Sequence, residues 1–337
     1  MTRSWRRRRD RGPDAGSSGW HRLDVEEGSR RLGAVTRLVL IILPIVLAMG
    51  GYLAYRAASQ HGSGDTLSTK AGSYLGVYIT GIPHSYGPVR EFVGSTGVRP
   101  NVLLYYSSWW EPFRTRFAVA AARHNEVPLV QINPERVSLR AIADGRYDAY
   151  ILSFAQTIDT YHRPVILSFG HEMNATWSKW GYKRASPATF VAAWRHIVDV
   201  FRSVGVRNVT WLWTVNVIDA HAHSLSPRPW WPGPQYVNWV GIDGYYRRQS
   251  WRFAALFGPT IKAVREFTRD PILIAETGVA PSAGKPQQIT NLFAGVRSYG
   301  LLGLVWFDAV AHQDWRIDNR AAIAAFHQAV RSTDVGQ

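Results

Sequence analysis

The sequence predicts an α/β fold, in which eight strands and their intervening helices close into a (β/α)₈ barrel preceded by a single N-terminal transmembrane helix. Short apolar runs recur eight times between residues 74 and 307, and amphipathic stretches separate them. An uncharged stretch of 18 residues lies upstream, at 38–55. Because such a barrel takes about 250 residues, the 337-residue chain holds one barrel and an N-terminal extension.

The eight apolar runs are interpreted as buried parallel strands. They are rich in β-branched and aromatic residues, which is typical of strands covered on both faces. The expected strands are Tyr74–Ile79, Asn101–Ser107, Val127–Ile132, Pro164–Gly170, Val209–Val215, Val237–Asp243, Pro271–Thr277 and Leu301–Phe307. Eight strands with right-handed crossovers in about 260 residues indicate a closed barrel. The absence of a glycine-rich phosphate loop after the first run disfavours a nucleotide-binding sheet.

The segments between the strands show helical patterns. The expected helices are Arg114–His124, Leu139–Thr160 with an interruption near Gly145, Ser186–Val204, Phe253–Thr268, Gln287–Ser298 and Arg320–Val330. Ser186 followed by Pro187 gives one of them a cap and a proline at the first helical position. Asp219–Gln235 is mostly Pro, His and Trp, so it is expected to be a loop.

Residues 38–55 are expected to form the transmembrane helix. Arg37 and Arg56 bracket this stretch, and 18 helical residues rise about 27 Å, close to the thickness of the hydrocarbon core. Ten arginines precede it, so the positive-inside rule places residues 1–37, an Arg-rich tail, in the cytoplasm. The alternative is a cleaved signal peptide, but its apolar region would be overlong and no clean cleavage site follows.

This topology places the rest of the chain outside the cell membrane as the extracellular part of a single-pass protein. Residues 56–72 are small and polar, typical of a flexible linker. Residues 73–333 are then the barrel domain, which we expect to be a monomer. Residues 1–56 hold 11 of the 39 basic residues, and the remainder of the +15 net charge is spread without a dense run. No nucleic-acid-binding motif accompanies it, so nucleic acid is not an expected partner.

Two glutamates lie at the ends of apolar strands, where barrel enzymes gather their chemistry. The fourth expected strand runs into Glu172 and the seventh into Glu276, across the barrel mouth from one another. A structural salt bridge could explain either carboxylate alone, but it explains both at matching ends poorly. Glycosidic bond cleavage requires two such carboxylates, one protonated and one ionised. The apolar flanks of Glu172 favour its neutral form.

Metal-dependent chemistry fits the sequence less well. The His171-Glu172 pair is not a zinc-protease motif, because that motif needs a second histidine at position 175, which is Ala, and a helix. His221 and His223 lie 50 residues away from His171, with no carboxylate spacing to connect them. The chain has no cysteine, so no Cys-ligated metal or disulfide is possible. We therefore expect no metal and no cofactor.

The segments around both glutamates resemble those of glycoside hydrolase family 26, the family of β-mannanases and related β-glucanases and xylanases. FGHEMNATWSKWG (Phe169–Gly181) resembles the family's acid/base segment, and ILIAETG (Ile272–Gly278) its nucleophile strand. Further matches in the same order are GRYDAYI (Gly145–Ile151), WLWTVN (Trp211–Asn216), YVNWVGIDGY (Tyr236–Tyr245) and DWRID (Asp314–Asp318). Six segments in register make the resemblance specific. Two loops, 221–234 and 246–252, depart from the family pattern.

The resemblance implies roles for individual residues. Glu172 would be the acid/base and Glu276 the nucleophile. His171 would contact the sugar, Trp177 would form a stacking platform, Tyr245 would hydrogen-bond the nucleophile, Asp243 would orient neighbouring groups, and Trp315 and Arg316 would line the non-reducing-end subsites. Two further tryptophans at strand ends, Trp109 and Trp306, are also expected to contact substrate. Core packing is the alternative for all the tryptophans.

The function predicted from these residues is a retaining glycoside hydrolase that cleaves a β-linked polysaccharide, β-mannan or β-glucan-like. Two other functions stay open at this point. One is a surface polysaccharide-binding protein without turnover, although such a protein has no need of both glutamates. The other is an enzyme that trims polymer emerging from a polysaccharide synthase, a partner that a membrane anchor would bring close.

Overall fold

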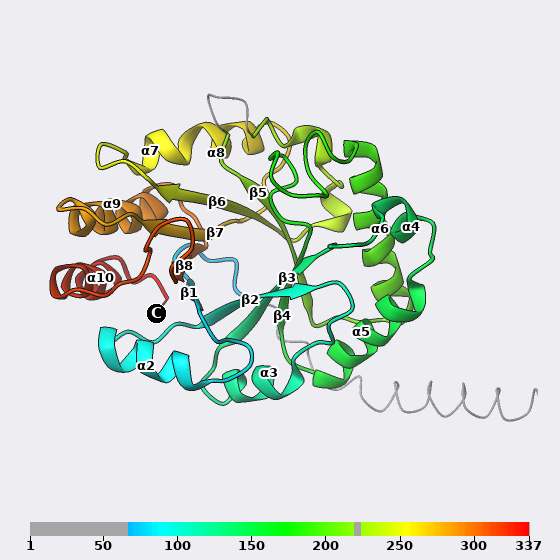
Figure 1. The fold of residues 1–337 in the computed structure, drawn as a ribbon, viewed down its shortest axis with the longest axis horizontal. Coiled ribbons are helices and arrows are strands. Elements are labelled where there is room, and N and C mark those ends of the chain that lie inside the picture. Colours follow the sequence, from blue (N-terminus) through cyan, green and yellow to red (C-terminus); the bar gives the residue numbers. More distant parts are fainter. Residues whose placement is uncertain (1–66, 219–223, 337) are drawn as a thin grey trace, which may run out of the picture. The chain divides into compact units, whose positions relative to one another are not determined.

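Eight parallel strands form a closed barrel, in which each strand pairs with the next and β8 pairs with β1 (Figure 1). The structure is a computed structural model and describes residues 67–218 and 224–336. The strands are β1 (Tyr74–Ile79), β2 (Val102–Ser108), β3 (Val127–Asn133), β4 (Val165–Phe169), β5 (Val209–Asn216), β6 (Trp239–Tyr246), β7 (Ile272–Val279) and β8 (Gly303–Asp308). The predicted (β/α)₈ barrel is confirmed.

Helices surround the ring of strands (Figure 1). They are α2 (Gly87–Thr96), α3 (Thr115–Ala122), α4 (Leu139–Ala143), α5 (Asp148–Tyr161), α6 (Pro187–Ser203), α7 (Phe253–Leu256), α8 (Gly258–Arg265), α9 (Lys285–Ser298) and α10 (Arg320–Thr333). The predicted interruption near Gly145 is confirmed as the break between α4 and α5. In the β5–β6 connection, the described part holds only two short 3₁₀ turns, η1 (Arg228–Trp230) and η2 (Pro234–Tyr236).

Two helical segments differ from the prediction. The expected helix at 253–268 is two helices, because Pro259 opens α8 and cannot continue the hydrogen bonding of α7. Helix α2 was not predicted from the sequence. It contains Pro88 and Gly94 and ends at Gly97, and these residues weaken a helical pattern.

Two apolar layers hold the barrel together. One fills its interior and consists of Tyr74, Val102, Leu104, Leu129, Ile166, Leu212, Trp239, Leu273, Ala275, Leu302 and Val305. The larger layer lies between the strands and the surrounding helices. The interior is packed so closely that a Cβ at Gly76 would meet Val305 at 2.7 Å. The interior near the amino ends of the strands is therefore filled with apolar side chains. The polar residues of the barrel interior lie nearer the carboxyl ends of the strands.

The folded domain is longer than the predicted 73–333. Residues 67–72, which we assigned to the linker, are bonded to the barrel. The Ser68 carbonyl accepts a hydrogen bond from the Tyr74 hydroxyl at 2.9 Å, and the Gly72 carbonyl accepts one from the Gly336 amide at 2.7 Å. At the other end, Val335 is fully buried. The linker boundary was placed wrongly because small polar residues also form close-packed turns.

No helix in the described ranges, 67–218 and 224–336, is long and apolar enough to cross a membrane. The predicted cytoplasmic tail (1–37), transmembrane helix (38–55) and most of the linker lie outside the described residues. They stay predictions. All described residues belong to one unit, residues 64–337.

Candidate active site

Glu172 follows β4 on a sharply turned backbone. Gly170 has φ +56°, and a Cβ there would meet Phe190 at 2.9 Å. Glu172 itself has φ +56°, in the left-handed region that side chains other than glycine rarely adopt. Its amide donates to the Thr214 carbonyl at 2.9 Å, which ties the turn to β5. Such backbone conformations cluster at functional sites, where surrounding structure maintains them.

Two side chains fix the Glu172 carboxylate. The Trp177 indole N–H donates to one oxygen, and the Asn216 amide donates to the other at 2.5 Å. Asn216 is itself held by Asn174, whose Oδ1 accepts from the main-chain N–H of Asn216 at 2.8 Å. Burial raises the pKa of Glu172, and the hydrogen bonds from Asn216 and Trp177 oppose that rise. Burial thus helps this carboxyl to keep a proton.

Glu276 is turned into the barrel by an irregularity in β7. Leu273 and Ala275 face the interior, so a regular strand would next point Thr277 inward. The register shifts between Ile274 and Thr277 relative to β8, and also relative to β6. Glu276 therefore also faces the interior, since such an irregularity re-aims a side chain.

Two tyrosines bind the Glu276 carboxylate, one to each oxygen. The Tyr106 hydroxyl, from β2, donates to Oε2, and the Tyr245 hydroxyl, from β6, donates to Oε1. Burial raises the pKa of Glu276 to about 7, and the charge of Glu172 adds to the rise, whereas the two hydroxyl donors oppose it. The structure thus brings Glu172 and Glu276 into one electrostatically linked site.

The Asp243 carboxylate and the His171 Nδ1 atom lie in the same site and have no hydrogen-bond partner among the described residues. Asp243 is fully buried, and within the described ranges neither of its carboxylate oxygens has a hydrogen-bond partner. Burial, and then the charges of Glu276 and Glu172, raise its pKa well above the ordinary value. His171 lies between Tyr106 and Trp180, at 5.6 and 5.8 Å between ring centroids. Burial lowers its pKa to about 4, so its imidazole is neutral at pH 7.

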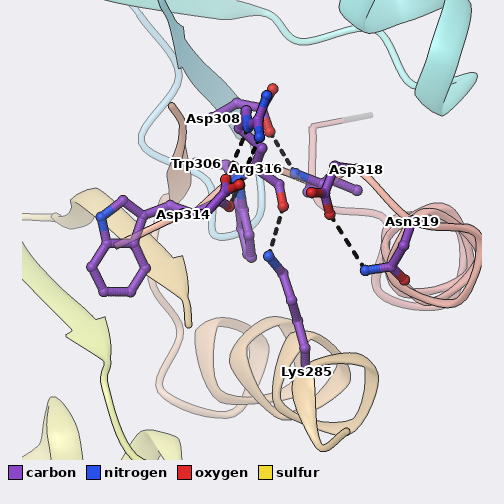
Figure 2. Close-up of polar contacts among 9 residues, drawn as sticks. Lys285, Trp306, Asp308, Asp314, Arg316, Asp318 and Asn319 are labelled. Atoms are coloured by element: carbon purple, nitrogen blue, oxygen red, sulfur yellow. Dashed lines mark hydrogen bonds and ion pairs between the residues drawn. The ribbon is translucent and has the colours of Figure 1, made fainter. Parts of the chain in front are cut away.

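The loop between β8 and α10 is tied to the barrel through its main chain (Figure 2). The buried Lys285, at the start of α9, donates from Nζ to the Arg316 carbonyl at 2.6 Å. Asp308, at the end of β8, accepts from the Ile317 amide at 2.7 Å. Burial lowers the pKa of Lys285 and raises that of Asp308 to about 6. These two contacts fix the loop beside the site.

Trp306 and Trp315 were predicted to contact substrate, but the structure buries both. Trp306 is 0% exposed, and its indole N–H donates to the Trp315 carbonyl at 3.1 Å. Trp315 is 2% exposed, packs against Gly278 and lies 4.5 Å from the Tyr245 ring. Trp306 is therefore a core residue. Trp315 packs against the Tyr245 ring, and a Cβ at Gly278 would meet Trp315 at 3.0 Å, so a glycine is needed there for this packing.

Arg316 and Trp177 remain open to solvent, whereas Trp109 does not. Asp314 holds the Arg316 guanidinium through two hydrogen bonds, at 2.9 and 2.6 Å (Figure 2). Trp177 is 55% exposed, with its indole next to Glu172. Trp109 is 5% exposed because aromatic neighbours cover it, Trp110 among them. The predicted stacking role of Trp109 thus lacks an accessible ring face.

Sequence reasoning missed Tyr106, Asn174 and Asn216 as functional residues. A signal for Tyr106 was present, because it continues the alternation of Val102 and Leu104 toward the barrel interior. The asparagines carry no signal of that kind, since their role depends on how two loops meet. Within the described ranges, no three His, Cys, Asp or Glu side chains are grouped so that they could hold a metal ion.

The sequence matches a known family over more than half of its length. The family described as "Glycosyl hydrolase family 26" matches residues 133–328. "Endoglucanase H" of Acetivibrio thermocellus is 29% identical over 307 residues, which cover 86% of this chain and 33% of that protein. A "Beta-1,3-xylanase" of Alcaligenes sp is 27% identical over 141 residues, 39% of this chain and 28% of that protein. The chain thus spans about a third of the length of these curated relatives.

Solved structures share the fold at lower sequence identity. An endo-β-1,4-mannanase double mutant from Cellulomonas fimi is 17% identical with a TM-score of 0.62, over 77% of this chain and 71% of that one. A β-mannanase from Bacteroides ovatus is 16% identical with a TM-score of 0.59, over 79% and 91% of the two chains. At these identities the likeness concerns the barrel alone.

Proposed function

The chain belongs to glycosyl hydrolase family 26, and from this premise we propose that it is a glycoside hydrolase that cleaves a β-linked polysaccharide with net retention of anomeric configuration. The pairing of Glu172 and Glu276 in one site supports the proposal most. Each carboxylate has two side-chain donors of its own, so each is held in a fixed orientation. Relatives named as endoglucanase, xylanase and mannanase make a β-mannan or β-glucan-like polymer the first substrate to test.

In this proposal Glu276 is the nucleophile and Glu172 the acid/base. The two phenol hydroxyls favour the ionised form of Glu276, the form that can attack the anomeric carbon. Glu172, whose pKa burial raises, protonates the departing glycosidic oxygen. It then removes a proton from the water that hydrolyses the glycosyl-enzyme. Asn216 and Trp177 keep its carboxyl aimed in both steps.

A panel of soluble β-mannans, β-glucans and β-xylans tests the proposal. Release of new reducing ends identifies the cleaved polymer, and proton NMR during the first minutes reports the anomer formed. We expect the β-anomer first, followed by slow mutarotation. An α-anomer as the initial product would refute retention, and failure to cleave any of these polymers would refute the proposed activity.

We also propose that the barrel is displayed outside the cell membrane, anchored by residues 38–55. The uncharged stretch and the ten arginines before it support this. Protease added to intact cells should cut between residues 56 and 66, upstream of the bonded residues 67–72, and release the barrel. A mature protein that begins at or beyond residue 48 would contradict the anchor and favour a signal peptide.

Replacing Trp177 tests substrate contact without disturbing the stability of the fold. Its ring is largely exposed, so Trp177→Ala should leave the thermal unfolding midpoint nearly unchanged. The loss of stacking and of the hydrogen bond to Glu172 should lower kcat/KM. The corresponding loss of transition-state stabilisation should be about 1–3 kcal/mol. Trp177→Phe keeps a ring but not the N–H, so it separates the two effects. A large fall in the midpoint would instead assign Trp177 to the core.

The electrostatic link between the glutamates predicts a change in pH dependence. The negative charge of Glu172 raises the pKa of Glu276. Glu172→Gln removes that charge, so the pKa of Glu276 should fall. Because Glu276 must be ionised to attack, the acidic limb of the rate of glycosyl-enzyme formation should move to lower pH. Burst kinetics on an activated aryl glycoside measure this rate, and an unmoved limb would contradict the link.

A further inference from the structure

Arg247 lies at the site and has not been accounted for by the chemistry proposed above. It follows Tyr245 and Tyr246 at the end of β6. Its guanidinium carbon lies 6.0 Å from the centre of the Tyr245 ring and 5.9 Å from the Trp315 ring. Tyr245 is the residue whose hydroxyl donates to Glu276. The guanidinium is therefore placed beside the group that binds the proposed nucleophile.

Arg247 forms no close ion pair in the described part of the chain, although its charge acts on Glu172 from a longer distance. No carboxylate of residues 67–218 or 224–336 lies within 4.0 Å of it, and no hydrogen bond from its guanidinium to these residues is formed. Arg316 is the contrasting case, because Asp314 occupies its guanidinium. Arg247 is exposed and supported by two aromatic rings, and none of its five N–H donors is engaged by residues 67–218 or 224–336.

Apart from Glu172, all the Asp, Glu, Lys and Arg residues in the two segments that follow β4 and β6 are basic. Residues 170–186 and 247–252 contain Glu172 as their single acidic residue. They contain the basic residues Lys179, Lys183, Arg184, Arg247, Arg248 and Arg252. Lys183 and Arg248 lie over the rings of Tyr182 and Trp251, at 5.4 and 5.9 Å. Both segments leave the carboxyl ends of their strands, so this positive charge lies at the same end of the barrel as the glutamates.

An unpaired cation at this place works against the proposed acid. The positive charge of Arg247 lowers the pKa of Glu172, whereas an acid catalyst has to keep its proton until the leaving group departs. A bound anion next to Arg247 would cancel that effect. A neutral sugar would not, because hydroxyl groups carry no charge. The arrangement therefore fits a substrate that supplies the missing negative charge.

We propose that the site around Glu172 and Glu276 binds an acidic β-linked polysaccharide, with Arg247 pairing with a carboxylate on a sugar unit close to the cleaved bond. The inference rests on the proposed glycoside hydrolase function and narrows its substrate class. A planar guanidinium matches a carboxylate through two parallel hydrogen bonds. The Tyr245 and Trp315 rings hold the guanidinium in place, so little conformational freedom is lost on binding.

Matched polymers test the inference with the full chain. The neutral polymer is the soluble β-glycan that the enzyme cleaves best in the panel. Its acidic partners are the same polymer with succinate esters and, where that polymer is a mannan or a glucan, the same polymer with part of its C6 groups oxidised to carboxylates. We expect kcat/KM to be about tenfold higher on at least one acidic partner at low salt. This preference should shrink at high salt.

Variants locate the preference at Arg247. Arg247→Gln should lower the ratio of acidic to neutral kcat/KM about tenfold, and Arg247→Lys should restore part of it through charge alone. Arg116→Gln is the matched control, since Arg116 is an exposed arginine on α3, outside the barrel, and should keep the wild-type ratio. Arg247→Gln should also move the alkaline limb of the kcat/KM profile on the neutral polymer to higher pH. The reason is that the charge that lowers the pKa of Glu172 is gone.

Three results would overturn the inference. The wild type could cleave the neutral polymer with no preference for either acidic one, which would leave the proposed glycoside hydrolase function standing. Arg247→Gln could keep the full preference, which would place the anion elsewhere. Finally, none of the polymers could be cleaved, which would remove the proposed function and this inference together.

Discussion

Replacing Glu276 with alanine should abolish cleavage of polysaccharides and of activated aryl glycosides alike, with a loss in kcat on the order of 10⁴-fold or more. The reason is that in the proposed mechanism Glu276 supplies the atom that bonds to the anomeric carbon, and no leaving group compensates for its absence. Tyr106 and Tyr245 would remain in place, but hydroxyl donors cannot replace a carboxylate nucleophile.

Mass spectrometry with a slowly hydrolysed fluorosugar measures this effect directly. The wild type should gain the mass of one sugar, on the peptide that contains Glu276, and Glu276→Ala should gain none. Glu266→Ala removes an exposed glutamate on the outside of the barrel and should behave as wild type. An adduct on Glu276→Ala, or on another residue in the wild type, would show that the nucleophile is misassigned.

Glu172→Ala should fail in a different way, because an acid is needed only when the leaving group requires a proton. Polysaccharide cleavage should fall by about 10²–10⁴-fold. An aryl glycoside with a good leaving group should still form the glycosyl-enzyme quickly and release a burst of phenol. Hydrolysis of that intermediate should then be slow, since no base activates the water.

Azide distinguishes this loss from misfolding. A small anionic nucleophile needs no general base, so it should restore turnover of Glu172→Ala and yield a β-glycosyl azide. Glu276→Ala should show no such product with retained configuration. If azide leaves Glu172→Ala unchanged, or if the burst is absent, then Glu172 does not act as the acid/base.

The barrel could be predicted from the sequence because parallel strands buried on both faces leave a simple apolar signal. Strand β1 was predicted with its exact bounds, and the end of β6 was misplaced by three residues, at Tyr246. Both glutamates could be singled out in the sequence because charged residues rarely interrupt such runs. Helix α2 was missed because its glycines and proline hide the helical period, while packing against α10 stabilises it in the fold.

The contacts within the site were less accessible to sequence reasoning. The inward turn of Glu276 depends on a register shift, and strand periodicity alone would have pointed Thr277 inward. The burial of Trp306 and Trp315 depends on how the β8–α10 loop folds back. A tryptophan at a strand end is equally compatible with a ligand platform and with core packing, and only the three-dimensional path of the loop distinguishes them.

The β8–α10 loop is fastened by Lys285 and Asp308 through its backbone carbonyl and amide groups, and this has a consequence for evolution. The side chain at position 316 can change without loosening the fastening, because no part of that bonding belongs to it. The same holds for position 247, whose side chain lies against rings and not in a bonded network. We therefore expect mutations at these two positions to alter contacts with a substrate while the two glutamates and their hydrogen-bond donors stay in place. Random libraries confined to Arg247 and Arg316 would explore new specificities from a scaffold that still folds.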